Sequence, residues 1–395
     1  MFTDKRDLTV REKDESYIAG TYKRFPVVLS HGKGSKIWDE NGKEYIDMGS
    51  GIGVTSFGIA DDEWQNAVSK QAAKLQHTSN LYYTQPCAVL AEKLCMKTGM
   101  SKVFFSNSGA EANECAIKAA RKYAAEKHGE DCYTVVTLKN SFHGRTLTTL
   151  AATGQEHYHE MYKPLTPGFE SVDVHNIFEL EALGSHTKIA AVMIECIQGE
   201  GGVNELKKSF VNEVAEYAQR RDILVICDEV QTGNGRTGQL YSYMNYGITP
   251  DIVTTAKGLA GGLPLGATLL GEKLKDIFTY GDHGSTFGGN PVCCAAAITV
   301  LDRIDEKLLS EVTAKGKYIV DAFSKTDGVE EISGMGLMIG LKTKKPAAEV
   351  VNKCLEKGVL CLTAKDKVRL LPALNIPMKD LEKAVEIIKT ACNEE

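Results

Sequence analysis

The chain has 395 residues, of which 46 are basic and 52 acidic, giving a formal net charge of −6, and 43% are apolar. Ordinary hydrophobicity excludes a disordered or collagen-like chain, and no apolar run approaches the roughly 18 residues of a membrane-spanning helix. Residues 1–15 are charged and lack the apolar stretch of a secretory signal. We therefore expect a soluble, cytoplasmic protein of α/β type, and the absence of a long basic run argues against nucleic-acid and membrane partners.

The eleven cysteines are scattered along the chain. No Cys-x-x-Cys pair is present, although Cys293 and Cys294 are adjacent. Zinc sites need local ligand pairs, and disulfide frameworks belong to short secreted chains. Cys227 lies inside the apolar run ILVIC, where a free cysteine acts as a small apolar side chain. The cysteines are predicted to be reduced and structural, with no metal bound.

The first clear structural signal is KIWDENGKEYID, residues 36–47. Two short apolar segments flank Asn41-Gly42, the commonest two-residue hairpin turn. The pattern predicts a β-hairpin.

From about residue 100, short apolar runs alternate with helical stretches such as 110–127 and 209–221. The runs are nearly continuous rather than alternating, which is typical of strands covered on both faces. They indicate a largely parallel sheet with helices on both sides. The runs are VFFS (103–106), YTVVTL (133–138), IAAVMIE (189–195), ILVIC (223–227), DIVTTA (251–256) and GATLLG (266–271).

After about residue 300 the pattern becomes that of a smaller α+β domain. We expect residues 61–300 to form the large domain and 301–395 the small one, with residues 1–60 joining the small domain. The expected elements are a helix near 291–306, the strand GLMIGL (336–341), a helix near 346–357, the segments VLCL (359–362) and VRLL (368–371), and an amphipathic helix at 378–392.

A small-residue segment, residues 106–111 (SNSGAE), follows a predicted strand and opens a helix. Free backbone N–H groups at a helix N-terminus, together with the helix dipole, favour an anion there. An ordinary N-cap is the simpler alternative. The segment lacks the Walker lysine and the G-x-G-x-x-G spacing, so a nucleotide is disfavoured.

Charged residues follow two of the predicted strands, where α/β sheets place ligands. Asp228 and Glu229 come directly after ILVIC, and Lys257 comes directly after DIVTTA and precedes a glycine-rich segment. Solvated loop acids and a surface lysine are the alternatives. With the anion segment, all three features fit one ligand, an aldehyde bearing a phosphate and a pyridine nitrogen. Lysine forms the imine, aspartate holds the pyridinium proton and the helix terminus takes the phosphate.

These features together resemble those of the class-III pyridoxal-phosphate-dependent aminotransferases of fold type I. The resemblance runs from residue 21 to about residue 373. It implies a seven-stranded, mostly parallel sheet in the large domain. Six ordered blocks carry it: NSGAEANECAIKAAR, SFHGRT, ECIQGEGG, CDEVQTGNGRTG, TTAKGLAGGLPLGA and HGSTFGGNP.

The resemblance assigns cofactor-binding roles to nine residues. Pyridoxal 5′-phosphate would be held as a Schiff base on Lys257, and Asp228 would pair with the ring nitrogen. The other cofactor contacts it implies are Gly109 and Ala110 (phosphate), Phe142 with His143 as its rival (one ring face), Val230 (the other face), Gln231 (ring hydroxyl), Glu229, and Thr286, which would reach the phosphate of the neighbouring subunit. A homodimer with shared active sites follows from the last of these.

The resemblance also implies the substrates. The terminal amino group of N2-acetylornithine would pass to 2-oxoglutarate in a ping-pong reaction of arginine biosynthesis, since HTSNLYYT (77–84) is most similar to members with that substrate. Arg369 would bind the α-carboxylate of glutamate and pair with Glu200 when no such carboxylate is present. We expect Arg145 to bind the distal carboxylate, with Ser285 assisting and Tyr22 lining the entrance.

Other readings remain open. Related aminotransferases act on succinylornithine, ornithine, N-acetyl-lysine-type substrates or 4-aminobutyrate, and a non-catalytic α/β protein that binds a phosphate ligand is the alternative from another class. Three departures from the family pattern stand out: residues 59–62 (IADD), Cys196 in place of proline, and Ala110 in place of threonine. The stretch 59–62 is predicted to lie near the entrance and to affect the choice of substrate.

Overall fold

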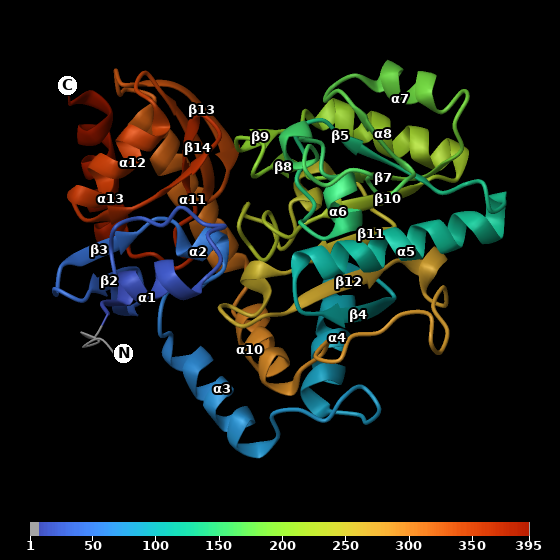
Figure 1. The fold of residues 1–395 in the computed structure, drawn as a ribbon, viewed down its shortest axis with the longest axis horizontal. Helices are drawn as coiled ribbons and strands as arrows, with labels where there is room; N and C mark the ends of the chain where they lie inside the picture. The colour runs from blue at the N-terminus through green and yellow to red at the C-terminus, as the bar shows by residue number, and fades with distance from the viewer. Residues whose placement is uncertain (1–7, 395) are drawn as a thin grey trace, which may run out of the picture.

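The computed structural model describes residues 8–394. Its largest sheet has seven strands in the order β4-β12-β11-β10-β7-β5-β6 (Figure 1). The run from β11 to β6 is parallel, whereas β12 is antiparallel to both of its neighbours. The strands are β4 (Lys102–Ser106), β5 (Thr134–Leu138), β6 (Phe169–Val172), β7 (Ile189–Ile194), β10 (Leu224–Asp228), β11 (Ile252–Thr255) and β12 (Gly266–Leu270). The prediction of a mostly parallel α/β sheet is confirmed.

Both faces of this sheet are covered, which explains the continuous apolar runs. Along β7, Ala191 and Met193 pack into one core, while Val192 and Ile194 pack into another on the opposite face. Helix α5 (Gly109–His128) supplies most helical residues of the first core, and α8 (Lys208–Arg221) contributes to the second. Strand β6 was not predicted because two of its four residues are exposed at the sheet edge.

A second sheet lies in the C-terminal part of the chain, in the antiparallel order β13-β14-β17-β16. Its strands are β13 (Val329–Met335), β14 (Met338–Thr343), β16 (Leu362–Ala364) and β17 (Lys367–Leu370), and the helices α11 (Glu306–Phe323), α12 (Ala347–Glu356) and α13 (Met378–Asn393) belong to the same region. The helix predicted near 291–306 is present as α10 (Pro291–Asp302). Helix α11 was not predicted; Asp305 caps it by accepting the N–H of Leu308 at 2.8 Å.

The predicted N-terminal hairpin is present as β2 (Lys36–Asp39) and β3 (Glu44–Asp47). Its predicted two-residue turn is wrong, because four residues separate the strands. Asp39 Oδ1 accepts the N–H groups of Asn41 and Lys43, each at 2.9 Å, and so organises a longer loop. Strand β3 pairs in parallel with β15 (Val359–Leu360), which joins the two ends of the chain in one sheet.

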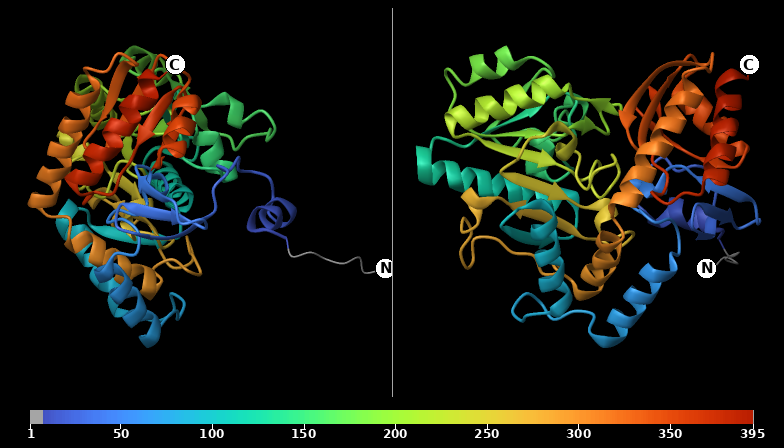
Figure 2. Two further views of the ribbon diagram at one scale, coloured as in Figure 1. Left: turned by 90° about the vertical axis from the view of Figure 1, so that its left-hand side faces the viewer. Right: turned by 180° about the vertical axis from the view of Figure 1, so that it is seen from behind.

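Three further features of the described residues concern helix α1, membrane-spanning helices and the cysteines. Helix α1 (Val10–Tyr17) projects from the rest of the molecule, and none of its residues is buried (Figure 2). Between residues 8 and 394 no helix is long and apolar enough to cross a membrane. All eleven cysteines are free, nine of them buried, in agreement with structural thiols.

The unusual stretch 59–62 serves the local fold. Ile59 pairs its backbone with Gly34, and Asp61 caps helix α3 (Asp62–Lys74) by accepting the N–H of Trp64 at 3.0 Å. Asp61 also forms a 2.6 Å ion pair with Arg303.

We expect Asp61→Ala to lower the free energy of unfolding by about 1–2 kcal/mol, since it removes a helix cap and a half-buried ion pair. Urea unfolding would measure it. Asp62→Ala is the matched control, because the Asp62 side chain is 84% exposed and, among the described residues, its one ion pair is with Lys33; its effect should stay within about 0.5 kcal/mol. Equal losses in the two variants would contradict this account of the 59–62 stretch.

Candidate active site

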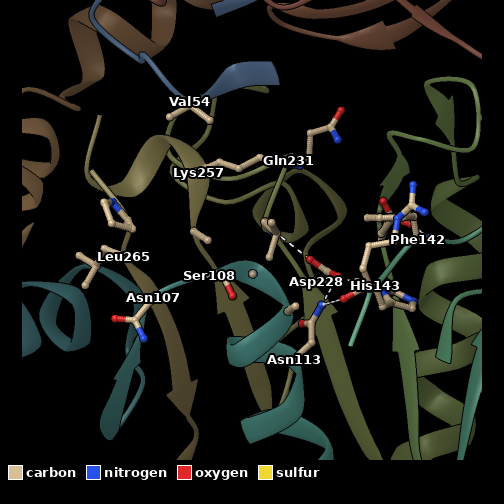
Figure 3. Close-up of a pocket in the computed structure, with 18 of the residues that line it drawn as sticks. Val54, Asn107, Ser108, Asn113, Phe142, His143, Asp228, Gln231, Lys257 and Leu265 are labelled. Atoms are coloured by element: carbon tan, nitrogen blue, oxygen red, sulfur yellow. Dashed lines mark hydrogen bonds and ion pairs between the residues drawn. The ribbon is translucent and has the colours of Figure 1, made fainter. Parts of the chain in front are cut away.

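A cavity of about 520 Å³ lies at the edge of the large sheet where its parallel strands end (Figure 3). Asp228 closes strand β10, and Lys257 follows strand β11. The first residues of α5 form another wall. Among the residues predicted for the site, the lining includes Gly109, Ala110, Phe142, Arg145, Asp228, Val230, Gln231 and Lys257.

The Asp228 carboxylate is almost fully buried and firmly oriented. Its Oδ2 accepts hydrogen bonds from Asn113 Nδ2 of α5 and pairs with His143 Nδ1, both at 2.8 Å, and its Oδ1 accepts the N–H of Val230 at 3.0 Å. Phe142 and His143 both line the cavity, and the His143 ring is held by its contact with Asp228. Asn113 was not predicted, because its contact with Asp228 spans 115 positions of sequence.

Lys257 is partly buried and has an unusual backbone, with φ of +45°. Burial lowers the pKa of its amine; the charge of Glu200 opposes this effect and the charge of Arg369 reinforces it. No hydrogen-bond acceptor within residues 8–394 is within bonding distance of Nζ. A desolvated amine of this kind is neutral, and hence nucleophilic, over a wider pH range than a surface lysine.

Glu195 is a further acid on the cavity wall, and it was not predicted although it opens the quoted block ECIQGEGG. Burial raises its pKa to about 7, against the opposing effect of His143. Its carboxylate accepts the N–H of Phe142 at 2.8 Å and that of Gly199 at 3.2 Å. Glu195 therefore fastens together two loops that border the cavity.

The N-terminus of α5 forms a small-residue cradle. Ser108 caps the helix by accepting the N–H of Glu111 at 3.2 Å, and the next N–H groups, of Gly109 and Ala110, have no partner within the helix. A Cβ on Gly109 would lie 2.5 Å from Val230 Cγ1, so only glycine fits there. The cradle presents free donors to the cavity, as an anion requires.

Arg369, on strand β17 of the second sheet, forms hydrogen bonds with Glu200 and Gln231 next to the cavity. Its Nη1 donates to Glu200 Oε1 at 2.6 Å and to Gln231 Oε1 at 3.0 Å. Burial by itself would raise the pKa of Glu200, but the charge and hydrogen bond of Arg369 outweigh it, and the pKa is lowered. Arg369 Nε is buried and lacks a partner within the described residues. We call this group, Glu200, Gln231 and Arg369, the arginine latch.

Other predicted site residues lie elsewhere. Ser285 and Thr286 line a second cavity of about 450 Å³ that shares only Asn107 with the first. Tyr22 is 74% exposed and its ring contacts Arg24.

The prediction for Glu229 needs correction, since it does not line the cavity. Its carboxylate is fully buried and accepts four hydrogen bonds, from the Thr232 hydroxyl, the Ser242 hydroxyl and N–H, and the Tyr243 N–H. Neighbouring residues at a strand end point to opposite sides, so Asp228 faces the cavity while Glu229 supports the following loop.

Comparison with known proteins gives consistent results. The family model described as Aminotransferase class-III matches residues 17–392. The acetylornithine aminotransferase of Haemophilus ducreyi is 48% identical over 98% of each chain, and that of Methanocaldococcus jannaschii is 43% identical over 95% of this chain and 96% of its own. Among solved structures, the N-acetylornithine aminotransferase of Stenotrophomonas maltophilia has a TM-score of 0.83 at 34% identity, covering 96% of this chain and 97% of its own. The ornithine aminotransferase of Toxoplasma gondii has a TM-score of 0.92 at 33% identity, covering 96% and 93%.

The buried amine predicts a specific pH dependence of stability. The folded chain holds the pKa of Lys257 below its ordinary 10.5. Between the two values the unfolded chain binds more protons, so this lysine makes stability rise with pH up to about 10.5. Lys257→Met keeps the length and removes the charge. We expect the ligand-free variant to be more stable than the wild type at pH 7, with a difference that shrinks toward pH 10. Urea unfolding at several pH values tests this, and parallel curves would contradict it.

Proposed function

This chain belongs to the class-III aminotransferase family, and we propose that it transfers the terminal amino group of N2-acetylornithine to 2-oxoglutarate, giving N-acetylglutamate semialdehyde and glutamate, in arginine biosynthesis. The observation that supports this best is the joint placement of Lys257, Asp228 and the α5 cradle around one cavity. The acetylornithine aminotransferases among its relatives, at 40–48% identity, support the choice of substrate.

The cofactor is pyridoxal 5′-phosphate, and the residues present fit it. The α5 cradle offers N–H donors with no partner in the helix, at a position where Val230 leaves no room for a Cβ on Gly109. The oriented Asp228 carboxylate suits a protonated ring nitrogen. The desolvated amine of Lys257 suits an aldehyde. When bound, the cofactor supplies an electron sink for the electrons released at the substrate carbon. We propose that Lys257 holds it covalently, that Phe142 and Val230 flank its ring, and that Gln231 meets its ring hydroxyl.

In this proposal Lys257 moves the proton. Once the substrate's amino group has taken its place, the freed Nζ would accept the proton from the carbon that bears the reacting amino group, Cδ of acetylornithine, and return a proton to complete the transfer. Asp228 keeps its negative charge beside the ring nitrogen, and Asn113 and His143 hold its carboxylate in place. Asp228, Asn113 and His143 are themselves buried, so little water reaches this carboxylate.

The arginine latch would let one site accept two unlike amino donors. Acetylornithine has no carboxylate beside its reacting amine, and Glu200 then neutralises Arg369 as it does in this structure. Glutamate does have one, and it would displace Glu200 to form charge-assisted bonds with the Arg369 fork. Arg145 would take the distal carboxylate of either donor, with Ser285 assisting when the donor is acetylornithine.

We further propose a cytoplasmic homodimer with shared sites. The second cavity, which holds Thr286, is lined in part by the exposed side chain of Phe287 (60% exposed). The 77–84 segment is fixed beside it, since Asn80 Nδ2 donates to the carbonyl of Ser285 at 2.9 Å, and Leu81 is 85% exposed. Exposed apolar surface of this kind favours coverage by a second copy. In such a dimer Thr286 would reach the partner subunit's phosphate.

The substrate is tested by comparing kcat/KM for acetylornithine, succinylornithine, ornithine and 4-aminobutyrate on the holoenzyme. The proposal expects acetylornithine to lead. A higher kcat/KM for ornithine, 4-aminobutyrate or succinylornithine would overturn the substrate, and inactivity with all four would overturn the proposed reaction. Succinylornithine differs from acetylornithine only in its acyl group, which is longer and ends in a second carboxylate, so this comparison tests acyl specificity by itself.

Single-turnover assays of the two half-reactions test the division between the arginines. Arg369→Ala should slow the glutamate half-reaction about 10-fold to 150-fold, the loss of a charge-assisted pair of about 1.5–3 kcal/mol, and affect the acetylornithine half-reaction far less. Arg145→Ala should weaken both. Equal loss of both half-reactions in Arg369→Ala would contradict the role of the latch.

A further inference from the structure

Arg145 is an exposed cation at the mouth of the cavity with an unusual environment. Within residues 8–394 it forms neither an ion pair nor a side-chain hydrogen bond. Its guanidinium carbon instead lies 4.1 Å from the ring centroid of Tyr158 and 5.5 Å from that of Phe142. The two rings meet edge to face, with centroids 5.7 Å apart and an interplanar angle of 69°. Aromatic faces alone fix the direction of this arginine.

The Tyr158 ring is itself held in place. It belongs to the short 3₁₀ helix η1 (Glu156–Tyr158), which buried residues fasten at each end. Before it, Gln155 Nε2 donates to the carbonyl of Ser141 at 3.1 Å, in the loop that carries Arg145. After it, the His159 ring bonds through Nε2 to the carbonyl of Leu150 at 2.9 Å. The loop and its aromatic support therefore form one unit.

We propose that Tyr158 is a positioning residue that holds Arg145 aimed at the distal carboxylate of the substrate. The inference rests on the proposed function, which assigns that carboxylate to Arg145. A carboxylate partner from the protein would also orient the arginine, but it would neutralise the charge and compete with the substrate. A ring face orients the guanidinium while its N–H donors stay available for a bidentate pair.

The ring also limits the freedom of the free side chain. An unsupported arginine samples many rotamers, and part of the substrate's binding energy would be used to order it. Both amino donors place a carboxylate at this end of the site, so loss of the ring should weaken both alike. This pattern differs from that of the arginine latch, which acts on glutamate alone.

The test compares Tyr158→Leu with Tyr158→Phe in the holoenzyme. Tyr158→Leu should raise KM for acetylornithine and for glutamate by about 2-fold to 30-fold, the range of a cation–π contact, with kcat changed less than about 3-fold. Tyr158→Phe keeps the ring and should restore KM to within about 2-fold of the wild type. Tyr162→Leu, at an exposed tyrosine of the same loop, is the matched control and should leave KM unchanged. If Tyr158→Phe is as damaging as Tyr158→Leu, the ring is not what matters and the proposal fails.

A double-mutant cycle identifies the partner. In an Arg145→Ala background, Tyr158→Leu should have no further effect on KM, whereas additive losses would overturn the proposal. The Kd of glutarate, an unreactive dicarboxylate, gives a readout that does not depend on turnover. This Kd should rise in Tyr158→Leu by the same factor as KM. If the wild type fails to use acetylornithine, the proposed substrate is wrong, while the glutarate measurement still decides the role of Tyr158.

Discussion

The structure depends on the pairing of buried charge at the carboxyl edge of the seven-stranded sheet. Asp228, Glu195 and Lys257 each lie at, or within two residues of, the end of a central parallel strand; the two carboxylates are buried and Lys257 is partly buried. An unpaired buried charge is costly, so the surrounding residues are fixed by the need to compensate it. Asn113 and His143 form hydrogen bonds with Asp228, and two backbone N–H groups donate to Glu195. The pKa of the Lys257 amine is lowered by burial. This arrangement places an amine with a lowered pKa and an oriented carboxylate in the lining of one cavity.

The arginine latch ties the C-terminal sheet to this edge. Arg369 comes from strand β17, whereas its partners Glu200 and Gln231 come from loops of the large sheet. The pair gives the buried Arg369 a carboxylate partner and lowers the pKa of Glu200. Removing one partner of such a pair without a substitute is strongly destabilising. In the proposed reaction an incoming carboxylate would supply that substitute, so the ion pair would act as a selective element. The net charge of −6 has little bearing on such a site, because the local field decides what binds.

The sequence predicted the sheet well wherever burial is complete, since six of its strands are continuous apolar runs. It failed at β6, which is half exposed, and at α11, where frequent charged residues obscure the apolar face of the helix. Lys257 and Asp228 were predicted because strand ends place ligands in α/β sheets. Their supporting contacts were not, since Asn113 and His143 reach Asp228 across 115 and 85 positions. Glu229 was misplaced because adjacency in sequence does not reveal which side of the strand end a residue faces. The domain boundaries at 60 and 300 stay predictions, as do the roles carried over to Thr286, Ser285 and Tyr22.

The central claim is that the desolvated amine of Lys257 is the group that binds the cofactor aldehyde. The most direct measurement is borohydride reduction of the protein after addition of pyridoxal 5′-phosphate, which converts an aldehyde bound to an amine into a stable secondary amine, followed by peptide mass mapping. The account predicts a single modified peptide, labelled at Lys257, and no label there in Lys257→Met. A label at another lysine, or no stoichiometric label in the wild type, would contradict it.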